Sequence, residues 1–282
     1  MKNKLIAMMA ILGVGVISAQ ASIEFSTSSG DHANSSVFKT WTITNLLSNP
    51  QSIIGVNVDS TQDIDPLQTN STAYSVGTVT GAQATDSFSF TATAATNWTT
   101  AGAQSAVGGS AFAFGTYLST TLDSTGVEVG SVSSSRLGVD SGALDAENNR
   151  FNPGEALMLT FDTTGLDAGS SLSLLAFTTA QAAAAEFSDV VFYDASSGLA
   201  TAFAWDEANM DDNTDAPSFG TTVIDDGDIL VFATGASQLG DTITDGWRVE
   251  TLTFDVIPEP ATLGMVAVFG GAILFIRRRF MI

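Results

Sequence analysis

The densest group of side chains able to do chemistry is an acidic run at residues 206–215, where carboxylates and amides fill most of the ten positions. These hard oxygen ligands suit Ca²⁺ better than a softer metal. The run is not an EF-hand, because placing Asp211, Asn213 and Asp215 at ligand positions 1, 3 and 5 puts alanine where that loop needs glycine and threonine where it needs glutamate. It therefore predicts either a solvated acidic loop or a calcium site of another kind, with candidate ligands Asp206, Asp211, Asn213 and Asp215.

A second, sparser acidic group is a further candidate for the same ion, with Asp140, Asp145 and Glu147 as its ligands. Neither group requires a metal, since a carboxylate-rich surface also keeps an exported protein soluble. Calcium is thus the one cofactor that the sequence suggests, with the solvated surface as the alternative.

Nucleophilic catalysis lacks its usual side chains here. The single histidine, His32, lies in a flexible-looking Gly-Asp-His-Ala-Asn segment near the N-terminus, and the chain has no cysteine. A Ser-His-Asp triad needs an imidazole, and zinc or thiol chemistry needs more His and Cys ligands than the chain holds. Carboxylate pairs that could cleave a glycoside are available among 30 acidic residues, but most are aspartates in turns. We therefore expect a protein that is not an enzyme.

Tryptophan side chains are the candidates for stacking on sugar rings. Trp98 lies between two small-residue segments that are typical of a loop, which predicts an exposed ring. Trp41, Trp205 and Trp247 lie in strand-like segments and are expected in the core.

The elements that would position these side chains are short strands. Alternating apolar and polar residues between Gly-, Ser- and Asp-rich turns predict strands with one face inward and one face in solvent. Only residues 179–187, which are rich in alanine, favour a helix. The pattern predicts an all-β domain at residues 22–257, an antiparallel β-sandwich that is jelly-roll-like and similar to lectin and carbohydrate-binding modules. The clearest strands are at 54–58, 88–92, 112–118, 157–161, 199–205, 229–233 and 252–256, with others at 37–44, 74–80, 127–132, 172–177 and 190–193.

The charge of the chain excludes some partners. The net charge is −21, and residues 22–257 hold every acidic side chain except Glu259. Nucleic acid and anionic lipid would be repelled by such a domain, so we expect neither as a partner.

The N-terminus has the three parts of a secretory signal peptide at residues 1–21. Lys2 and Lys4 precede an uncharged apolar run at residues 5–17, and Ala19 and Ala21 are the small residues that flank a signal peptidase site. The apolar run is about 20 Å long as a helix, which is too short to span a bilayer core of about 30 Å. We expect cleavage after Ala21.

The C-terminus, residues 258–282, has a second tripartite pattern. Pro258, Glu259 and Pro260 interrupt any strand or helix, and the 16 uncharged residues at 261–276 follow them. As a transmembrane helix this segment is about 24 Å long and a weak anchor. A cationic flank stays in the cytoplasm, so residues before 258 would face away from it. That flank consists of Arg277, Arg278 and Arg279.

This tail resembles the PEP-CTERM sorting signal of Gram-negative, biofilm-forming bacteria. The resemblance rests on the Pro-Glu-Pro tripeptide, the glycine-containing apolar helix, the arginine triplet and the position at the C-terminus. It implies that the chain is the substrate of an exosortase, a membrane enzyme that recognises the Pro-Glu-Pro segment and releases the protein to the cell surface or to the exopolysaccharide matrix. The partners implied are the secretion machinery, the exosortase and the membrane.

Together these features predict an exported protein, held transiently in the inner membrane facing the periplasm and then moved to the cell surface or extracellular matrix. Its expected role is structural or glycan-binding within exopolysaccharide or biofilm. The alternatives are a calcium-dependent carbohydrate-binding module, an ice-binding protein or, less favoured, a polysaccharide-degrading enzyme.

Overall fold

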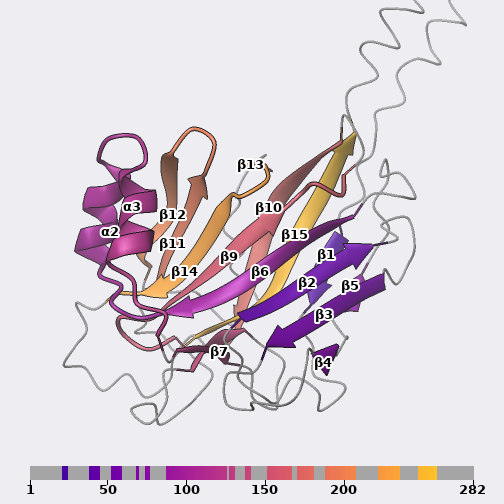
Figure 1. Ribbon diagram of the computed structural model, residues 1–282, viewed down its shortest axis with the longest axis horizontal. Helices are drawn as coiled ribbons and strands as arrows, with labels where there is room; N and C mark the ends of the chain where they lie inside the picture. The colour runs from indigo at the N-terminus through magenta and orange to yellow at the C-terminus, as the bar shows by residue number, and fades with distance from the viewer. Residues whose placement is uncertain are drawn as a thin grey trace, which may run out of the picture.

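The protein is built almost entirely from antiparallel strands (Figure 1). The computed structural model describes residues 21–24, 38–44, 52–58, 68–69, 74–76, 87–125, 127–130, 137–140, 151–166, 170–180, 188–207, 222–235 and 247–258. Every strand pair among them is antiparallel, so the all-β prediction is confirmed.

The described strands form one large, one medium and one small sheet. The eight-stranded sheet has the order β12 (Leu199–Glu207), β11 (Ser188–Asp194), β14 (Ile229–Thr234), β9 (Ala156–Asp162), β6 (Phe88–Ala95), β2 (Phe38–Thr44), β3 (Ser52–Val58) and β4 (Gln68–Thr69). The five-stranded sheet has the order β13 (Thr222–Ile224), β10 (Ser170–Ala180), β15 (Arg248–Pro258), β1 (Ala21–Glu24) and β5 (Tyr74–Val76). The smallest sheet pairs β7 (Glu128–Gly130) with β8 (Gly138–Asp140).

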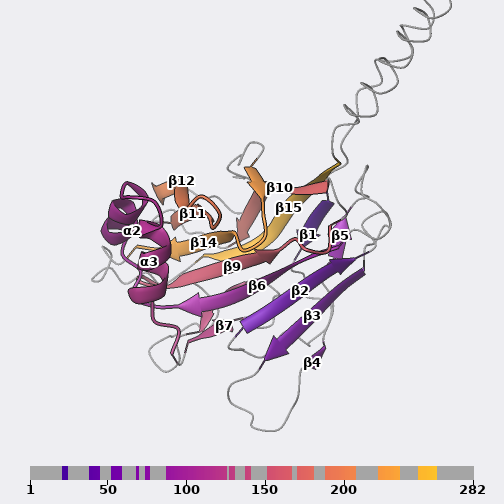
Figure 2. The same cartoon turned by 45° about the horizontal axis from the view of Figure 1, so that its top comes forward.

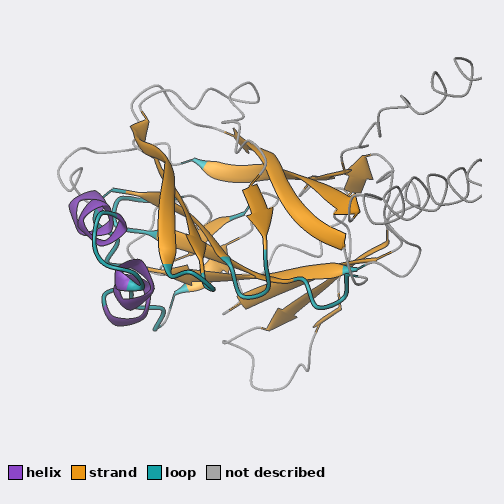
Figure 3. Ribbon diagram, turned by 90° about the horizontal axis from the view of Figure 1, so that it is seen from above, coloured by secondary structure: helices purple, strands orange, loops and turns teal. Residues whose placement is uncertain are grey.

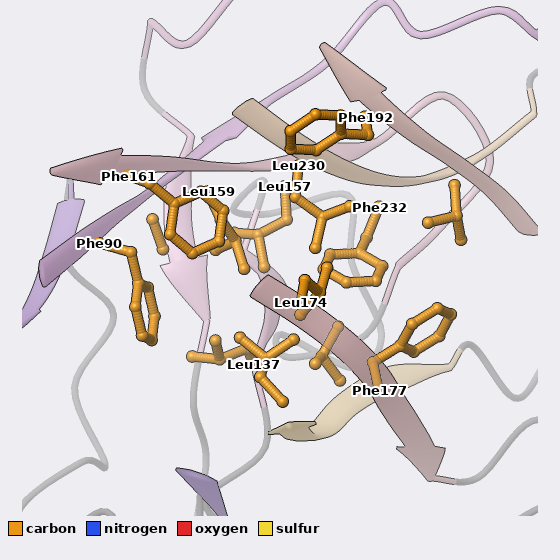
Figure 4. Close-up of a cluster of buried hydrophobic side chains, with 14 of the residues drawn as sticks. Phe90, Leu137, Leu157, Leu159, Phe161, Leu174, Phe177, Phe192, Leu230 and Phe232 are labelled. Carbon is orange, nitrogen blue, oxygen red and sulfur yellow. The ribbon is translucent and has the colours of Figure 1, made fainter. Parts of the chain in front are cut away.

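The main core lies between the two larger sheets. Figure 4 shows side chains of β6, β9 and β14 pointing toward those of β10. Aromatic rings join the sheets: the Phe177 and Phe232 centroids are 5.0 Å apart, and the Phe88 and Phe254 centroids are 5.2 Å apart, both in edge-to-face geometry. Because the cluster draws on both sheets, its burial is what holds them together.

Two helices cover part of the outer face of the eight-stranded sheet, at the end formed by β9, β14, β11 and β12. They are α2 (Thr100–Val107) and α3 (Ala113–Thr120), which lie beside β11, β12 and β14 (Figure 2) and gather at one end of the molecule (Figure 3). A second apolar cluster forms beneath them. It takes side chains from Val191 and Tyr193 of β11 and from Val231 and Ala233 of β14.

This cover corrects the expectation that each strand has one solvated face. In β14, Leu230 and Phe232 face the core between the sheets, while Val231 faces the helices. Strands β11 and β14 are therefore buried on both faces. Strand β12 has a register shift opposite Val190 and Val191 of β11. Because such a shift changes which face a side chain points to, Phe203 packs on the main core while Trp205, two residues later, packs on the cluster beneath the helices.

The predicted strand at residues 112–118 is wrong, because this segment belongs to α3. Phe114, Tyr117 and Leu118 are spaced three and four residues apart and all are buried, which is helical periodicity. The sequence alternation included Phe114 and Leu118 but ignored Tyr117 between them. Of the predicted helix at residues 179–187, Thr179 and Ala180 belong to β10, and the remainder lies outside the described residues.

Candidate functional site

The two ends of the described fold meet in one sheet. Strand β1 begins at Ala21 and pairs with β15, with Ala21 opposite Phe254. Strand β15 ends at Pro258, opposite Ser170 of β10, one residue beyond the predicted end of the domain. Pro258 is therefore the last residue of the ladder rather than a break before it, although its nitrogen carries no hydrogen to donate.

The other residues of the two processing signals lie outside the described residues. They are Ala19, Glu259, Pro260, Arg277, Arg278 and Arg279. Within the part of the chain that the structure describes, no helix has both the length and the apolar character needed to cross a bilayer.

The predicted calcium ligands fall mostly outside the described residues as well. Asp206 lies in β12 and Asp140 ends β8. Among the residues whose positions are described, no three His, Cys, Asp or Glu side chains are grouped closely enough to hold a metal ion. His32 and the remaining candidates Asp211, Asn213, Asp215, Asp145 and Glu147 are not among them.

Trp98 is buried, which contradicts the prediction of an exposed, sugar-stacking ring. Its exposed fraction is 0 %, and its ring packs edge-to-face on Phe114 and Tyr117, with centroids 6.2 and 5.6 Å away. The preceding Asn97 has φ 70°, a left-handed turn that asparagine tolerates and that redirects the chain after β6. Trp247 is buried as expected, and the side chain of Trp41 is not described.

A buried carboxylate accounts for the position of Trp98. The indole Nε1–H of Trp98 donates to Oδ2 of Asp189 at 2.6 Å, and the hydroxyl of Thr100 donates to the same oxygen at 2.7 Å. Asp189 is fully buried at the start of β11, and Thr100 begins α2. Gly235, which follows β14, leaves room for this arrangement, because a Cβ there would overlap the Thr100 hydroxyl. We call Trp98, Thr100 and Asp189 the carboxylate network.

The carboxylate network fastens the start of α2 to the sheet, and a tyrosine fastens α3 to the same point. The Tyr117 hydroxyl accepts a hydrogen bond from the Thr99 amide at 3.0 Å and donates to the Thr99 carbonyl. The Thr99 hydroxyl in turn accepts from the Gly102 amide and caps α2. All of these contacts are within the protein, and they position the two helices on the sheet.

Aspartates in the described turns serve the turns themselves. The Ser197 and Ser196 side chains and amides donate to the carboxylate of Asp194 and lower its pKa to about 2. Burial raises the pKa of Asp228, whose two carboxylate oxygens accept from the Ala195 and Asp225 amides. Both carboxylates therefore close the loops at one end of β11 and β14.

Exposed large apolar side chains form the other notable surface feature. In the described residues they are Phe112, Leu199 and Val223, with exposed fractions of 52 %, 61 % and 44 %. Phe112 precedes α3, and its amide donates to the Gly198 carbonyl at 2.8 Å, so it lies beside the turn that leads into Leu199. The sequence had assigned Phe112 to a strand, and its exposure comes from the helix that follows it.

Comparisons with known proteins identify no family. No family model matches the chain, and no curated protein matches it. A structure of the infectious bursal disease virus Gt strain is 12 % identical with a TM-score of 0.27, over 87 % of this chain and 56 % of that chain. The VP2 subviral particle of the same virus is 16 % identical with a TM-score of 0.21, over 86 % and 73 %. This chain thus spans little more than half of the first, and the likeness is too slight to bear on fold or function.

Proposed function

We propose that the protein is an exported, non-enzymatic component of the cell surface or extracellular matrix, sorted through its C-terminal tail by an exosortase-like enzyme. Its fold would be a jelly-roll-like sandwich between a cleaved signal peptide and a C-terminal transmembrane helix. Its role there would be structural or glycan-binding.

The positions of β1 and the end of β15 in the sheet support this proposal. Cleavage after Ala21 would keep Ser22, Ile23 and Glu24, the residues that join β1 to both β15 and β5. Cleavage at or after Pro258 would keep all of the β15 pairs with β1 and all but the last with β10. Both predicted signals can therefore be removed at the margin of the sheet without loss of its core.

Deletion of residues 258–282 tests the sorting function. We expect the shortened chain to be exported, folded and released to the medium, because the strand ladder ends where the deletion begins. Cell fractionation and surface proteolysis measure its location, and circular dichroism confirms its fold.

A matched variant separates recognition of the tripeptide from anchoring. Replacing Pro258, Glu259 and Pro260 by alanine keeps the apolar segment and the arginines, so this variant should stay in the inner membrane. Surface delivery of either variant at the parental level would contradict the proposal.

A further inference from the structure

The loop and helices around Phe112 form a surface that differs from the rest of this acidic protein. Residues 87–122 contain no Asp, Glu, Lys, Arg or His, in a chain whose net charge is −21. We call the exposed part of residues 101–121 the neutral face. Besides Phe112, its exposed polar side chains are amides and hydroxyls, those of Gln104, Ser105, Ser110, Thr116, Ser119, Thr120 and Thr121.

Phe112 has a backbone conformation that an aromatic residue rarely adopts. Its φ is 65° and its ψ is 2°, in the left-handed region where glycine and asparagine are favoured. The ring is nevertheless half exposed, so little burial offsets this unfavourable conformation. Unfavourable backbone geometry of this kind is often retained where a side chain is needed for function.

The chain is shaped to hold the Phe112 ring at the surface. A Cβ at Gly198 would lie 2.5 Å from Cδ1 of Phe112, so the ring rests directly over the backbone of Gly198. Gly198 itself has φ 72°, which glycine adopts without penalty. The hydrogen bond from the Phe112 amide to the Gly198 carbonyl fixes the same contact. One side of the ring is thus supported by the Gly198 backbone, and Phe112 as a whole remains half exposed.

We infer that Phe112 is a stacking platform for a sugar ring of an uncharged polysaccharide. A pyranose offers an apolar C–H face to an aromatic ring and hydroxyls at its rim, which the neutral amides and hydroxyls around Phe112 can pair. The absence of charge on this face matches a neutral glycan. This inference rests on the proposed matrix function for the source of the glycan, and it adds the surface that binds it.

The size and charge of the surface argue against other occupants. A stable protein interface buries about 800 Å² on each partner with some 20–30 residues, whereas Phe112 is the one large apolar side chain exposed among residues 101–121. An anionic membrane or nucleic acid would be repelled by the net charge of the protein. The nearby carboxylate of Asp194 accepts hydrogen bonds from Ser196 and Ser197 of its own turn.

Binding of the full chain to polysaccharides tests the platform. The protein, expressed with its own leader and purified in mild detergent, is incubated with insoluble neutral glucans and xylan, with the anionic polymer alginate, and with anionic lipid vesicles. We expect binding to at least one neutral polysaccharide. Phe112→Gly should weaken it about tenfold, equivalent to about 1.4 kcal/mol, while Phe112→Tyr should retain it.

Stability measurements separate a binding role from a structural one. Glycine suits the left-handed backbone, so Phe112→Gly should melt within about 4 °C of the parent, whereas a purely structural ring would lower the melting temperature when removed. Val223→Ala, on β13 of the other sheet, is the control and should leave binding unchanged.

Four results would overturn the inference: no binding to any neutral polysaccharide, equal binding by Phe112→Gly, vesicle binding that depends on Phe112, or self-association that Phe112→Gly abolishes in size-exclusion chromatography. Cell fractionation of the same variants reports on surface delivery independently. A chain that reaches the surface without binding glycan would therefore refute the platform and leave the sorting proposal intact.

Discussion

The carboxylate network gives the sharpest test of how the helices are held on the sheet. Asp189→Leu would leave the Trp98 indole N–H and the Thr100 hydroxyl buried without their acceptor. A hydrogen bond to a charged group contributes about 1.5–3 kcal/mol, so the two together should be worth about 3–6 kcal/mol. That is a large part of the 5–15 kcal/mol or so by which a domain is normally stable.

A double-mutant cycle isolates this contribution. Asp189→Leu is made in the parent and in a Trp98→Phe/Thr100→Val background, where neither donor remains. Its cost should be smaller in that background by about 3–6 kcal/mol, because no donor is left unpaired there. Urea unfolding is followed by far-UV circular dichroism, since Trp98 is itself a fluorophore.

Two comparisons make the cycle decisive. Equal costs of Asp189→Leu in the two backgrounds, within about 0.5 kcal/mol, would refute the idea that this carboxylate serves the two donors. Thr160→Val, at an exposed position of β9, is the matched control for Thr100→Val and should change stability by less than about 0.5 kcal/mol.

The remaining predictions concern one aspartate and one glycine. The lowered pKa of Asp194 means that its ionised form stabilises the fold above the ordinary value of 3.8, and that this contribution is lost as the pH falls toward 2. Between about pH 4 and pH 2, the melting temperature of Asp194→Asn should therefore fall less than that of the parent. An equal fall in the two proteins would contradict this role of Asp194. Gly115→Ala should cost about 1–3 kcal/mol in urea unfolding, because its Cβ would overlap the Tyr193 hydroxyl. Gly108→Ala is its control, with 3.5 Å to the Gln104 carbonyl oxygen, and an equal loss in both would contradict this packing.

The buried carboxylate network and the exposed Phe112 are connected through α2 and α3. Asp189 holds the first residue of α2, Tyr117 of α3 is hydrogen-bonded to Thr99, and Phe112 lies immediately before α3. The hydrogen bond between Thr100 and Asp189, which are 89 residues apart in the sequence, thus helps to position the helices next to Phe112. The interior network and the proposed platform are therefore joined by hydrogen bonds through the same pair of helices.

The longer strands of the two larger sheets were predicted from the sequence because their signal is local, whereas the short strands β1, β4 and β13 were not. Alternating apolar residues in β6 and β9 are buried on the face toward the main core, and the turns between β11 and β12 and between β13 and β14 carry their own aspartates and glycines. The acidic balance and the patterns at both ends are likewise properties of the linear chain.

The tertiary structure decided what the apolar residues around Trp98 do. The Phe114 and Leu118 positions fit a strand as well as a helix. The helix is favoured because it packs these side chains, with Tyr117, on the apolar outer face of β9, β11 and β14, which α2 and α3 cover among the described elements. Trp98 lies in a loop, as predicted, but its burial was missed because its acceptor, Asp189, is 91 positions away. The one local hint was an aspartate directly before the apolar run of β11. Burial of a polar group depends on a partner that only folding brings near, so no reading of neighbouring residues could have placed it.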